Sequence, residues 1–341
     1  MKPLVSIITP TFSHQQFIAR CLSSVLAQDY EYWELIVIDD ASPDDTGEIA
    51  EQFSRQDHRI RVVRHPTNYG AARLSETYNE ALQQCQGQLI SVLEGDDEWV
   101  PTKLGQQVPA FSDARVVLCY ADYDEITSDG LLITRHRASA AAAPHRSGLR
   151  ENLGFFSELK SFGANTVMVR REDLLAIGGF VNAGLSLVDY PTWLRLAFRG
   201  DFVRVSSVLG HWRRHQNSVY WATEYLTLER LEQHFLDLLR TEHQNLLALG
   251  LSGEELAQLA QNPARALREK QRGRAYFEGK YQLLMGRRLS AIGPFGRAIL
   301  APGTSLRHRL GALAGMLAAA TSPRLILPLS RIRQTPTPAR K

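Results

Sequence analysis

Two acidic clusters follow two short apolar runs, and their carboxylates are the groups in this sequence best placed to hold a cation or a donor-rich ligand. The run at residues 35–38 ends in Asp39 and Asp40, and the run at 89–93 ends in an acidic turn, residues 94–97, of sequence Glu-Gly-Asp-Asp. Short apolar runs rich in β-branched residues are typical of buried strands of a parallel sheet. Carboxylates at the ends of such strands line the crevice where open α/β sheets bind ligands. Because converging carboxylates repel one another, the clusters predict a metal ion, a nucleotide, or both.

The sequence lacks the glycine-rich loops that bind phosphate in other nucleotide sites. There is no GxGxxG after the first expected strand and no GxxxxGK[ST] in the chain, which argues against a dinucleotide-binding fold and a P-loop. The phosphates of a bound nucleotide would therefore need another counter-charge. A divalent cation held by Asp96 and Asp97 would supply it, because hard cations bind carboxylate and phosphate oxygens together. The alternative is that this acidic turn is merely solvated.

The elements that must position these groups alternate between strand and helix over residues 1–125. We expect strands at residues 4–8, 35–38, 60–63, 89–93 and 116–120, and helices at 46–56 and 75–84. Such alternation predicts an α/β fold with a mostly parallel sheet between helices. Further patterns predict strands at 166–169 and 202–205, a polar basic loop at 211–218, and helices from 224 to about 284.

The charge of the chain is divided unevenly along its length. The 341 residues carry a formal net charge of +3, but residues 280–341 hold 11 of the 39 Lys and Arg residues and no Asp or Glu. The remainder has 39 − 11 = 28 basic and 36 acidic residues, a net charge of −8. The basic segment, which alternates arginines with apolar stretches, predicts peripheral contact with anionic lipid, and we expect no nucleic-acid partner. The alternative is a packed or partly disordered helical extension, in which prolines break any long helix: Pro294, Pro302, Pro323 and Pro328.

Cysteine usage and the N-terminus bear on the compartment. Cys21, Cys85 and Cys119 are odd in number and lack the spacing of a zinc site, which indicates a reducing environment. The chain enters an expected strand without a secretory signal, and no run of about 18 apolar residues occurs. These features predict a cytoplasmic protein, with the inner face of the cell membrane as a second location.

Several motifs occur in one order along the chain: Thr9-Pro10-Thr11-Phe12, Val37-Ile38-Asp39-Asp40-Ala41-Ser42-x-Asp44-x-Thr46, Asn68-x-Gly70 and Leu93-x-x-Asp96-Asp97-x-x-x-Pro101. Over residues 4–220 they resemble the family 2 glycosyltransferases, which have the GT-A fold. Independent motifs in a shared order make this resemblance specific, where any one would be weak. It implies inverting transfer of a sugar from a nucleoside diphosphate sugar, with UDP as the expected nucleotide, to a hydroxyl of a saccharide or lipid-linked acceptor. Polysaccharide biosynthesis of the cell envelope is the implied setting.

The resemblance also assigns the donor side of the site. The nucleotide-binding residues that it implies are Thr9, Pro10, Phe12, Asp40, Arg73 and Asp96. In this assignment Asp40 accepts a hydrogen bond from the uracil imide, and Asp96 contacts ribose or metal. Asp97 becomes the chief protein ligand of Mg²⁺ or Mn²⁺. For Arg73, which follows the Asn68-x-Gly70 turn, the alternative is an exposed arginine at the start of a helix.

The implied catalytic base is Asp189, within a segment that resembles the family's GGF…EDxxxWxR element: Gly178-Gly179-Phe180 followed by Leu187-Val188-Asp189-Tyr190-x-x-Trp193-Leu194-Arg195. Such a base removes the proton of the acceptor hydroxyl, which is otherwise a poor nucleophile. Trp193 is implied on the acceptor side. Val188 replaces the usual Glu and removes a like charge, which predicts a smaller rise in the pKa of Asp189. The alternative is that Asp189 is simply the N-cap of the helix that follows.

A last segment, Trp212-Arg213-x-His215-x-x-Ser218, resembles the family's YRxHxxS sequence, which in some members closes over the diphosphate. It makes Arg213, His215 and Ser218 the candidates for a donor loop. The alternative for His215 is a structural histidine in a basic loop.

These observations predict a GT-A domain over residues 1–222, a helical basic extension over 223–334 and a disordered tail over 335–341. Two other functions stay open. A nucleotidyltransferase can also place a metal-binding aspartate on an α/β sheet, but it would normally have a glycine- and lysine-bearing loop, which residues 11–16 do not provide. A catalytically inactive module that binds a nucleotide sugar is favoured by Val188 alone.

Overall fold

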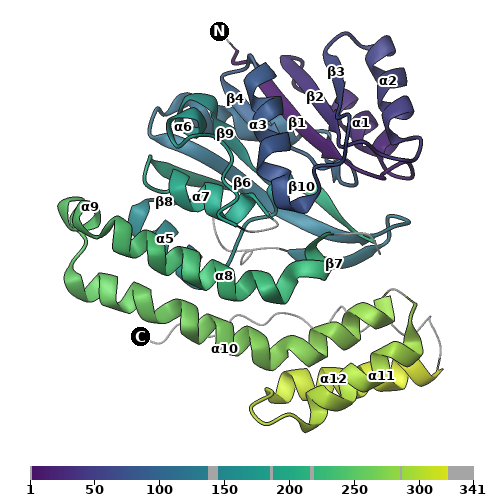
Figure 1. Cartoon of the computed structure of the whole chain (residues 1–341), viewed down its shortest axis with the longest axis vertical. Coiled ribbons are helices and arrows are strands. Elements are labelled where there is room, and N and C mark those ends of the chain that lie inside the picture. Colours follow the sequence, from purple (N-terminus) through teal and green to yellow (C-terminus); the bar gives the residue numbers. More distant parts are fainter. Residues whose placement is uncertain (1, 137–144, 185–186, 216–218, 285, 322–341) are drawn as a thin grey trace. The chain divides into compact units, whose positions relative to one another are not determined.

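The computed structural model describes residues 2–136, 145–184, 187–215, 219–284 and 286–321. In that part of the chain ten strands form one sheet in the order β3-β2-β1-β4-β9-β6-β10-β5, with β7 paired to β6 and β8 to β10 (Figure 1). The strands are β1 Val5–Thr11, β2 Trp33–Asp39, β3 Ile60–Arg64, β4 Leu89–Val92, β5 Glu98–Trp99, β6 Val116–Thr127, β7 Leu132–His136, β8 His145–Ser147, β9 Met168–Arg170 and β10 Asp201–Arg214.

Helices flank this sheet, and further helices follow later in the chain (Figure 1). They are α1 Ile18–Leu26, α2 Thr46–Gln56, α3 Leu74–Gln84, α4 Lys103–Gln107, α5 Leu149–Ser157, α6 Arg171–Ala176, α7 Asp189–Leu196, α8 Val219–Thr241, α9 His243–Ala248, α10 Gly253–Leu284, α11 Arg288–Leu300 and α12 Leu306–Thr321. The predicted α/β class with a mostly parallel sheet is therefore confirmed.

The parallel core of the sheet brings both acidic clusters to one edge. β1 is buried along its whole length and pairs in parallel with β2 on one side and β4 on the other. At the carboxyl ends, Thr11 of β1 lies opposite Asp39 of β2, and the Leu93 amide donates to the Ile8 carbonyl at 3.0 Å. Since neighbouring parallel strands end at the same edge, the groups after β2 and β4 meet on either side of the end of β1.

Strand β10 is longer than the sequence pattern predicts. Residues 211–214, expected in a polar loop, continue the strand and pair with β6 as far as Thr127. The prediction is wrong because the basic side chains here are buried in ion pairs: Arg214 lies 2.7 Å from Glu125, and both are buried. A strand whose charges are neutralised by its neighbour has no apolar pattern to reveal it.

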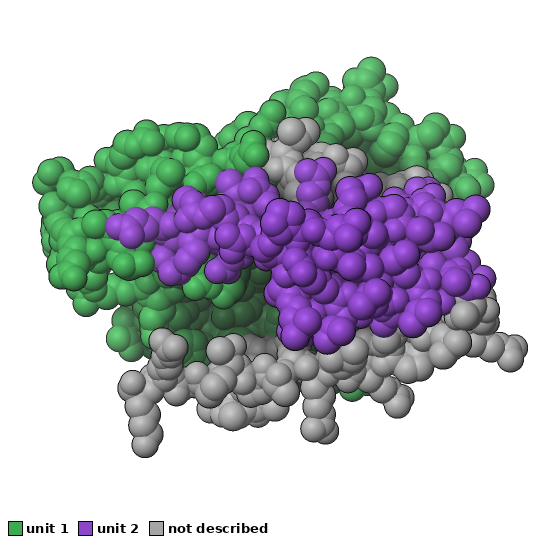
Figure 2. All heavy atoms as spheres, turned by 90° about the horizontal axis from the view of Figure 1, so that it is seen from below, with its two compact units in different colours: residues 1–214, 218–260 green, residues 215–217, 261–341 purple. Residues whose placement is uncertain are grey.

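The chain separates into two compact units, coloured separately in Figure 2. The first comprises residues 1–214 and 218–260, and the second comprises 215–217 and 261–341. Helices α8 and α9 thus belong to the unit that contains the sheet, whereas the sequence placed the boundary at residue 222. The predicted tail at 335–341 lies outside the described residues.

The second unit has its own core, in which alanines surround Phe295 and Leu283. Ala291, Phe295 and Ala298 of α11 pack against alanines of α12. A Cβ at Gly315 of α12 would lie 2.4 Å from Cζ of Phe295, so this close approach requires glycine. The expected helix break occurs at Pro302, between the two helices, whereas Pro294 lies inside α11. Within the described residues, no helix is both long and apolar enough to cross a membrane.

A buried lysine supports the strand that leads into the acidic turn. Lys103 of α4 is fully buried, and its ammonium donates to Ser91 Oγ of β4 at 2.6 Å. It also lies 4.1 Å from the centroid of the Trp99 ring. Burial lowers the pKa of Lys103 from its usual 10.5 to about 7. The native protein therefore loses a proton at this position that the unfolded chain retains up to a higher pH.

This difference predicts a pH-dependent stability. Between about pH 7 and pH 10 the unfolded state binds the extra proton, so the unfolding free energy gains about 1.4 kcal/mol per pH unit from Lys103. We expect urea denaturation to show wild type gaining stability relative to Lys103→Met as pH rises from about 6 to about 9. The same substitution at the exposed Lys160 should give a constant difference. A pH-independent difference for Lys103→Met would contradict the assignment.

Candidate functional site

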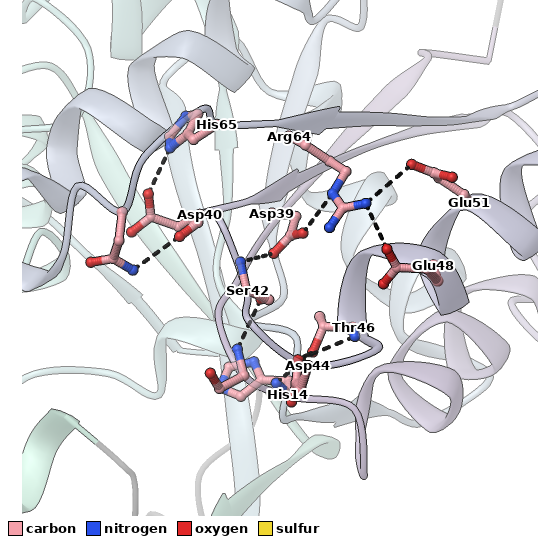
Figure 3. Close-up of polar contacts among 12 residues, drawn as sticks. His14, Asp39, Asp40, Ser42, Asp44, Thr46, Glu48, Glu51, Arg64 and His65 are labelled. Carbon is pink, nitrogen blue, oxygen red and sulfur yellow. Dashed lines mark hydrogen bonds and ion pairs between the residues drawn. The ribbon is translucent and has the colours of Figure 1, made fainter.

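The loop after β1 is fastened to the loop after β2 (Figure 3). The Ser13 amide donates to Ser42 Oγ at 2.9 Å, and the His14 amide donates to Thr46 Oγ1 at 2.8 Å. Thr46 is held in turn by Asp44, whose Oδ1 accepts bonds from its hydroxyl at 2.5 Å and its amide at 3.2 Å. These bonds explain why the serine, aspartate and threonine after β2 occur at fixed spacing, and they position the His14 ring.

Asp39 is a structural carboxylate. Its side chain is fully buried, Oδ1 accepts a bond from the Ser42 amide at 3.1 Å, and Oδ2 accepts one from Arg64 Nε at 3.1 Å (Figure 3). Arg64 also contacts α2, with its guanidinium 2.9 Å from Glu48 and 3.7 Å from Glu51. Asp39 therefore joins the end of β2, the loop that follows and β3.

Asp40 closes the Asn68-x-Gly70 turn. Its carboxylate accepts bonds from the amides of Tyr69 at 2.8 Å and Gly70 at 2.9 Å. His65 Nδ1 lies 2.7 Å from Asp40 Oδ1 (Figure 3). The Asn68 amide group donates to the Asp40 carbonyl at 2.9 Å. Each carboxylate oxygen can accept more than one hydrogen bond, so this clamp leaves acceptor capacity for a ligand. The predicted contact of Asp40 with a uracil imide stays a prediction.

The other predicted donor residues differ in how much surface they offer. Phe12, at the end of β1, is 43% exposed, whereas Thr9 is fully buried and its Oγ1 has no hydrogen-bond partner among the described residues. Arg73 ends a short 3-10 helix before α3 and makes two bonds to Glu76, at 2.9 and 2.6 Å. Its guanidinium also lies 3.8 Å from the centroid of the Tyr69 ring. A donor contact for Arg73 stays a prediction.

The backbone of the acidic turn after β4 packs directly against the end of β1 and the loop that follows it. The Gly95 amide donates to the Pro10 carbonyl at 3.1 Å. A Cβ at Gly95 would lie 2.4 Å from Thr11 Oγ1 and 3.0 Å from His14 Nδ1, so this position requires glycine. As a result, Asp96 Oδ2 lies 3.9 Å from His14 Nε2.

Arg213 of β10 supports the acidic turn from inside the protein. Its side chain is fully buried; its amide donates to Asp97 Oδ1 at 2.8 Å, and its Nε donates to the Asp96 carbonyl at 2.8 Å. The guanidinium also contacts Glu98 and the carbonyls of the β6–β7 turn. This burial does not support the predicted diphosphate contact of Arg213, and Ser218 lies outside the described residues.

Burial and neighbouring charges raise the pKa values of two carboxylates of the turn. Burial and then the charge of Asp96 raise the pKa of Glu94 to about 7, although a hydrogen bond from the Tyr78 hydroxyl at 2.8 Å opposes the rise. Burial, Asp96 and Glu94 likewise raise the pKa of Asp97 well above its usual value. The raised pKa values mean that the ionised carboxylates are unfavourable without a counter-charge. A cation beside this turn would therefore be bound favourably.

Asp189 is the first residue of α7 and lies within electrostatic reach of the turn, because its charge contributes to the raised pKa of Glu94. The Ser161 hydroxyl donates to Asp189 Oδ2 at 2.9 Å. The N-cap alternative is wrong: the cap is Val188, and no side chain caps this end. Val188 is buried, and burial raises the pKa of Asp189 although no acidic neighbour stands at position 188. Desolvation thus raises the pKa of Asp189 even without the like charge that a Glu at position 188 would supply.

Trp193 is a residue of α7 whose side chain is buried in the core. It is 1% exposed and packs edge-on against Phe180, with ring centroids 6.2 Å apart. Asn79 holds Phe180 by bonds to its amide at 2.8 Å and from its own amide group to the Phe180 carbonyl at 2.9 Å. This burial does not support an acceptor contact for Trp193. The Gly-Gly-Phe sequence and Trp193 instead form the packing that positions Asp189.

One group of side chains has the donor atoms of a metal site. Ring nitrogens of His14 and His215 and a carboxylate oxygen of Asp96 all lie within 4.8 Å of one another. The set combines one charged oxygen with two imidazoles, which suits a transition metal. Asp97, the residue that the sequence favoured as chief ligand, does not belong to this set, because its carboxylate faces the Arg213 amide.

A family model described as Glycosyl transferase family 2 matches residues 6–177. The chain belongs to this family. Among relatives, the Bacillus subtilis (strain 168) glycosyltransferase TuaG, whose name assigns it to teichuronic acid biosynthesis, is 30% identical over 220 residues, which cover 64% of this chain and 82% of TuaG. The Escherichia coli glucosyltransferase WfgD is 35% identical over 129 residues, 38% of this chain and 49% of WfgD.

Solved structures confirm the GT-A fold of this family 2 glycosyltransferase. Staphylococcus aureus TarS in complex with UDP-GlcNAc superposes with a TM-score of 0.53 at 18% identity, over 85% of this chain and 89% of TarS. The mannosyltransferase PcManGT from Pyrobaculum calidifontis, in complex with GDP-Man and Mn²⁺, gives a TM-score of 0.54 at 18% identity. The match covers 96% of this chain and 85% of PcManGT. At this identity the likeness shows the fold alone.

Sequence reasoning counted Glu94 in the acidic turn without giving it a role of its own, and it missed Tyr78 and His14 as members of the site. Glu94 was visible as the first residue of the acidic turn, and its position at the end of a strand was the available signal. His14 lies two residues after the first family motif, without a spacing that suggests a ligand. Tyr78 has no signal in the sequence, because its bond to Glu94 depends on how α3 packs on the sheet.

The geometry of this family 2 enzyme predicts which aspartate holds the cation. We expect Asp96→Asn to weaken Mn²⁺ binding about tenfold or more, because the site loses its charged ligand. Asp97→Asn should bind Mn²⁺ within about threefold of wild type, because Asn retains the oxygen that accepts the Arg213 amide. The loss of the free Mn²⁺ signal in electron paramagnetic resonance measures both, with UDP present. The reverse order of the two variants would restore Asp97 as the ligand.

Proposed function

We propose that this family 2 glycosyltransferase transfers a sugar from a nucleoside diphosphate sugar, with UDP as the expected nucleotide, to a hydroxyl acceptor with inversion at the anomeric carbon. The observation that carries the proposal is the juxtaposition of a cation-demanding acidic turn with Asp189, a carboxylate of raised pKa. The nucleotide sugars bound by TarS and PcManGT, which share this fold, support the donor class.

Asp96 and His14 are the residues that we propose as ligands of a divalent cation, with His215 as the third donor. A donor set with two imidazoles favours Mn²⁺ over Mg²⁺, which mostly binds oxygen ligands. When bound, the ion would neutralise charge that develops on the departing diphosphate. Glu94 adds negative charge beside this set, and Arg213 keeps the backbone of the turn in place.

Asp189 acts as the general base in this proposal. The Ser161 hydroxyl orients one of its oxygens, and the packing of Trp193 of α7 against Phe180 holds the residue in position. The acceptor hydroxyl gives its proton to Asp189 as its oxygen bonds to the anomeric carbon and the bond to the diphosphate breaks. Attack from the face opposite the leaving group inverts that carbon in one step. A raised pKa makes Asp189 a stronger base than an ordinary carboxylate.

The acceptor in this proposal is a saccharide or a lipid-linked saccharide of cell-envelope polysaccharide synthesis. The name of TuaG refers to teichuronic acid, and the name of WfgD refers to a GlcNAc-diphosphoundecaprenol acceptor, although the alignment spans only 49% of WfgD. A lipid-linked acceptor would require the enzyme to work at a membrane surface. The cytoplasmic location stays a prediction.

The proposed activity is tested by incubating the full chain with Mn²⁺ and a panel of UDP-, GDP- and dTDP-sugars, with and without EDTA. We expect nucleoside diphosphate release from one donor class and its loss with EDTA, because the acidic turn needs its counter-charge. Release of pyrophosphate would indicate a nucleotidyltransferase instead. Binding without release would indicate an inactive nucleotide-sugar module.

The base assignment predicts a second result. With the active donor, Asp189→Asn should lower kcat about 10²- to 10⁴-fold, because the acceptor proton loses its base. Wild-type kcat should fall as pH drops through the pKa of Asp189, which burial places above that of an ordinary aspartate. Asp237→Asn, at an exposed site on α8, is the control and should keep both the rate and the pH profile. Full activity of Asp189→Asn would remove the assignment.

A further inference from the structure

The exposed face of α12 carries leucines, while the side chains that this helix buries in the core of its unit are alanines. The exposed fractions are 72% for Leu306, 57% for Leu310, 46% for Leu313 and 67% for Leu317. The buried side chains of the same helix are alanines, such as Ala312. An amphipathic helix of a soluble protein normally turns its larger apolar residues toward the core. Here that order is reversed.

The four leucines form one continuous stripe. They are spaced i, i+4, i+7 and i+11, which places them on one face of a helix. Helix α11 has two exposed leucines of its own, Leu289 at 85% and Leu300 at 82%, which share a face of that helix because they are eleven residues apart. Single exposed leucines are ordinary, but a contiguous apolar stripe indicates a surface that binds a partner or a membrane.

The segment that carries this leucine stripe has charges of one sign. Residues 286–321 contain five arginines and no Lys, Asp or Glu: Arg287, Arg288, Arg297, Arg307 and Arg309. Arg307 is exposed and directly follows the first leucine of the stripe. Arg297 forms an ion pair with Glu278 of α10 at 3.0 Å, which offsets one of these five positive charges. A second copy of this chain would bring like charges together, whereas an anionic surface attracts them.

The length of α12 distinguishes lying on a bilayer from crossing it. Its 16 residues span about 24 Å, which is short of the hydrocarbon core of about 30 Å. An apolar face flanked by arginines is typical of a helix that lies in the interface, where apolar burial and attraction to anionic headgroups add. We propose that the leucine stripe of α12 and its arginines dock on an anionic lipid bilayer.

This docking deepens the proposed function, because it would bring the enzyme to a lipid-linked acceptor. It rests on the proposed function only for that purpose, since lipid binding needs no sugar transfer. The two can fail separately. Vesicle binding without nucleoside diphosphate release would leave the docking surface and remove the activity, and the converse would remove the docking surface alone.

The test is co-sedimentation of the full chain with vesicles of phosphatidylcholine alone or mixed with phosphatidylglycerol. Wild type should bind the mixed vesicles, bind phosphatidylcholine weakly, and lose affinity as salt is raised. The double variant Leu310→Gln/Leu317→Gln should bind at least about tenfold more weakly, because it loses two inserting side chains. Glutamine keeps the helix propensity of leucine, so circular dichroism should be unchanged.

Matched variants separate the contributions. Leu131→Gln/Leu249→Gln changes two leucines that are 60% and 52% exposed in the other unit, and it should bind as wild type does. Arg288→Gln/Arg307→Gln should weaken binding to the anionic vesicles and flatten its salt dependence. Release of nucleoside diphosphate with a soluble acceptor should be unchanged in all three variants.

Three outcomes would overturn the proposal. Wild-type vesicle binding by Leu310→Gln/Leu317→Gln would show that the stripe does not insert. Loss of binding in a chain that ends at residue 321, with binding retained in the leucine variant, would assign the lipid contact to residues 322–341. A dimer by light scattering that the leucine substitutions convert to a monomer would show that a second copy covers the stripe.

Discussion

The burial of several carboxylates at one edge of the sheet is the constraint on which the site depends. Glu94, Asp96 and Asp97 follow one strand, and the charge of Asp189 of α7 acts on Glu94. Desolvation by burial is the largest cause of the raised pKa values of Glu94 and Asp97, and the charge of Asp96 adds to it. Arg213 offsets part of the cost by bonding the backbone and the carboxylate of the turn. The remaining negative charge is available to a cation.

The two acidic clusters look equivalent in the sequence but do different work in the fold. Asp39 and Asp40 mainly hold loops in place. Asp39 accepts hydrogen bonds from Arg64 and the Ser42 amide, and Asp40 closes the turn before α3. Asp96 is the carboxylate that faces two imidazoles. The difference arises because the loops after β1 and β2 need internal acceptors, whereas the turn after β4 is fixed by Gly95 and by β10.

The C-terminal unit distributes its apolar side chains differently from the unit that contains the sheet. Small residues let α11 and α12 approach closely, so their core is formed without the leucines. Those leucines remain on the surface beside arginines, in a segment free of acidic residues between 286 and 321. The basic segment that stands out in the charge count is thus a folded helical pair over the described part of its length, rather than a chain without structure.

By itself the sequence determined the parallel strands, the position of the acidic groups at their ends and the GT-A fold. Each of these can be recognised from local sequence patterns, without knowing how the elements pack. It also predicted Asp189, through a motif. Only the tertiary structure decided that residues 211–214 continue β10, that Arg213 is buried under the turn and that His14 meets Asp96. These features join residues some 80 to 120 positions apart, and a buried charge paired across strands leaves no periodic signal. Chemistry at this site is therefore specified by which strands lie side by side.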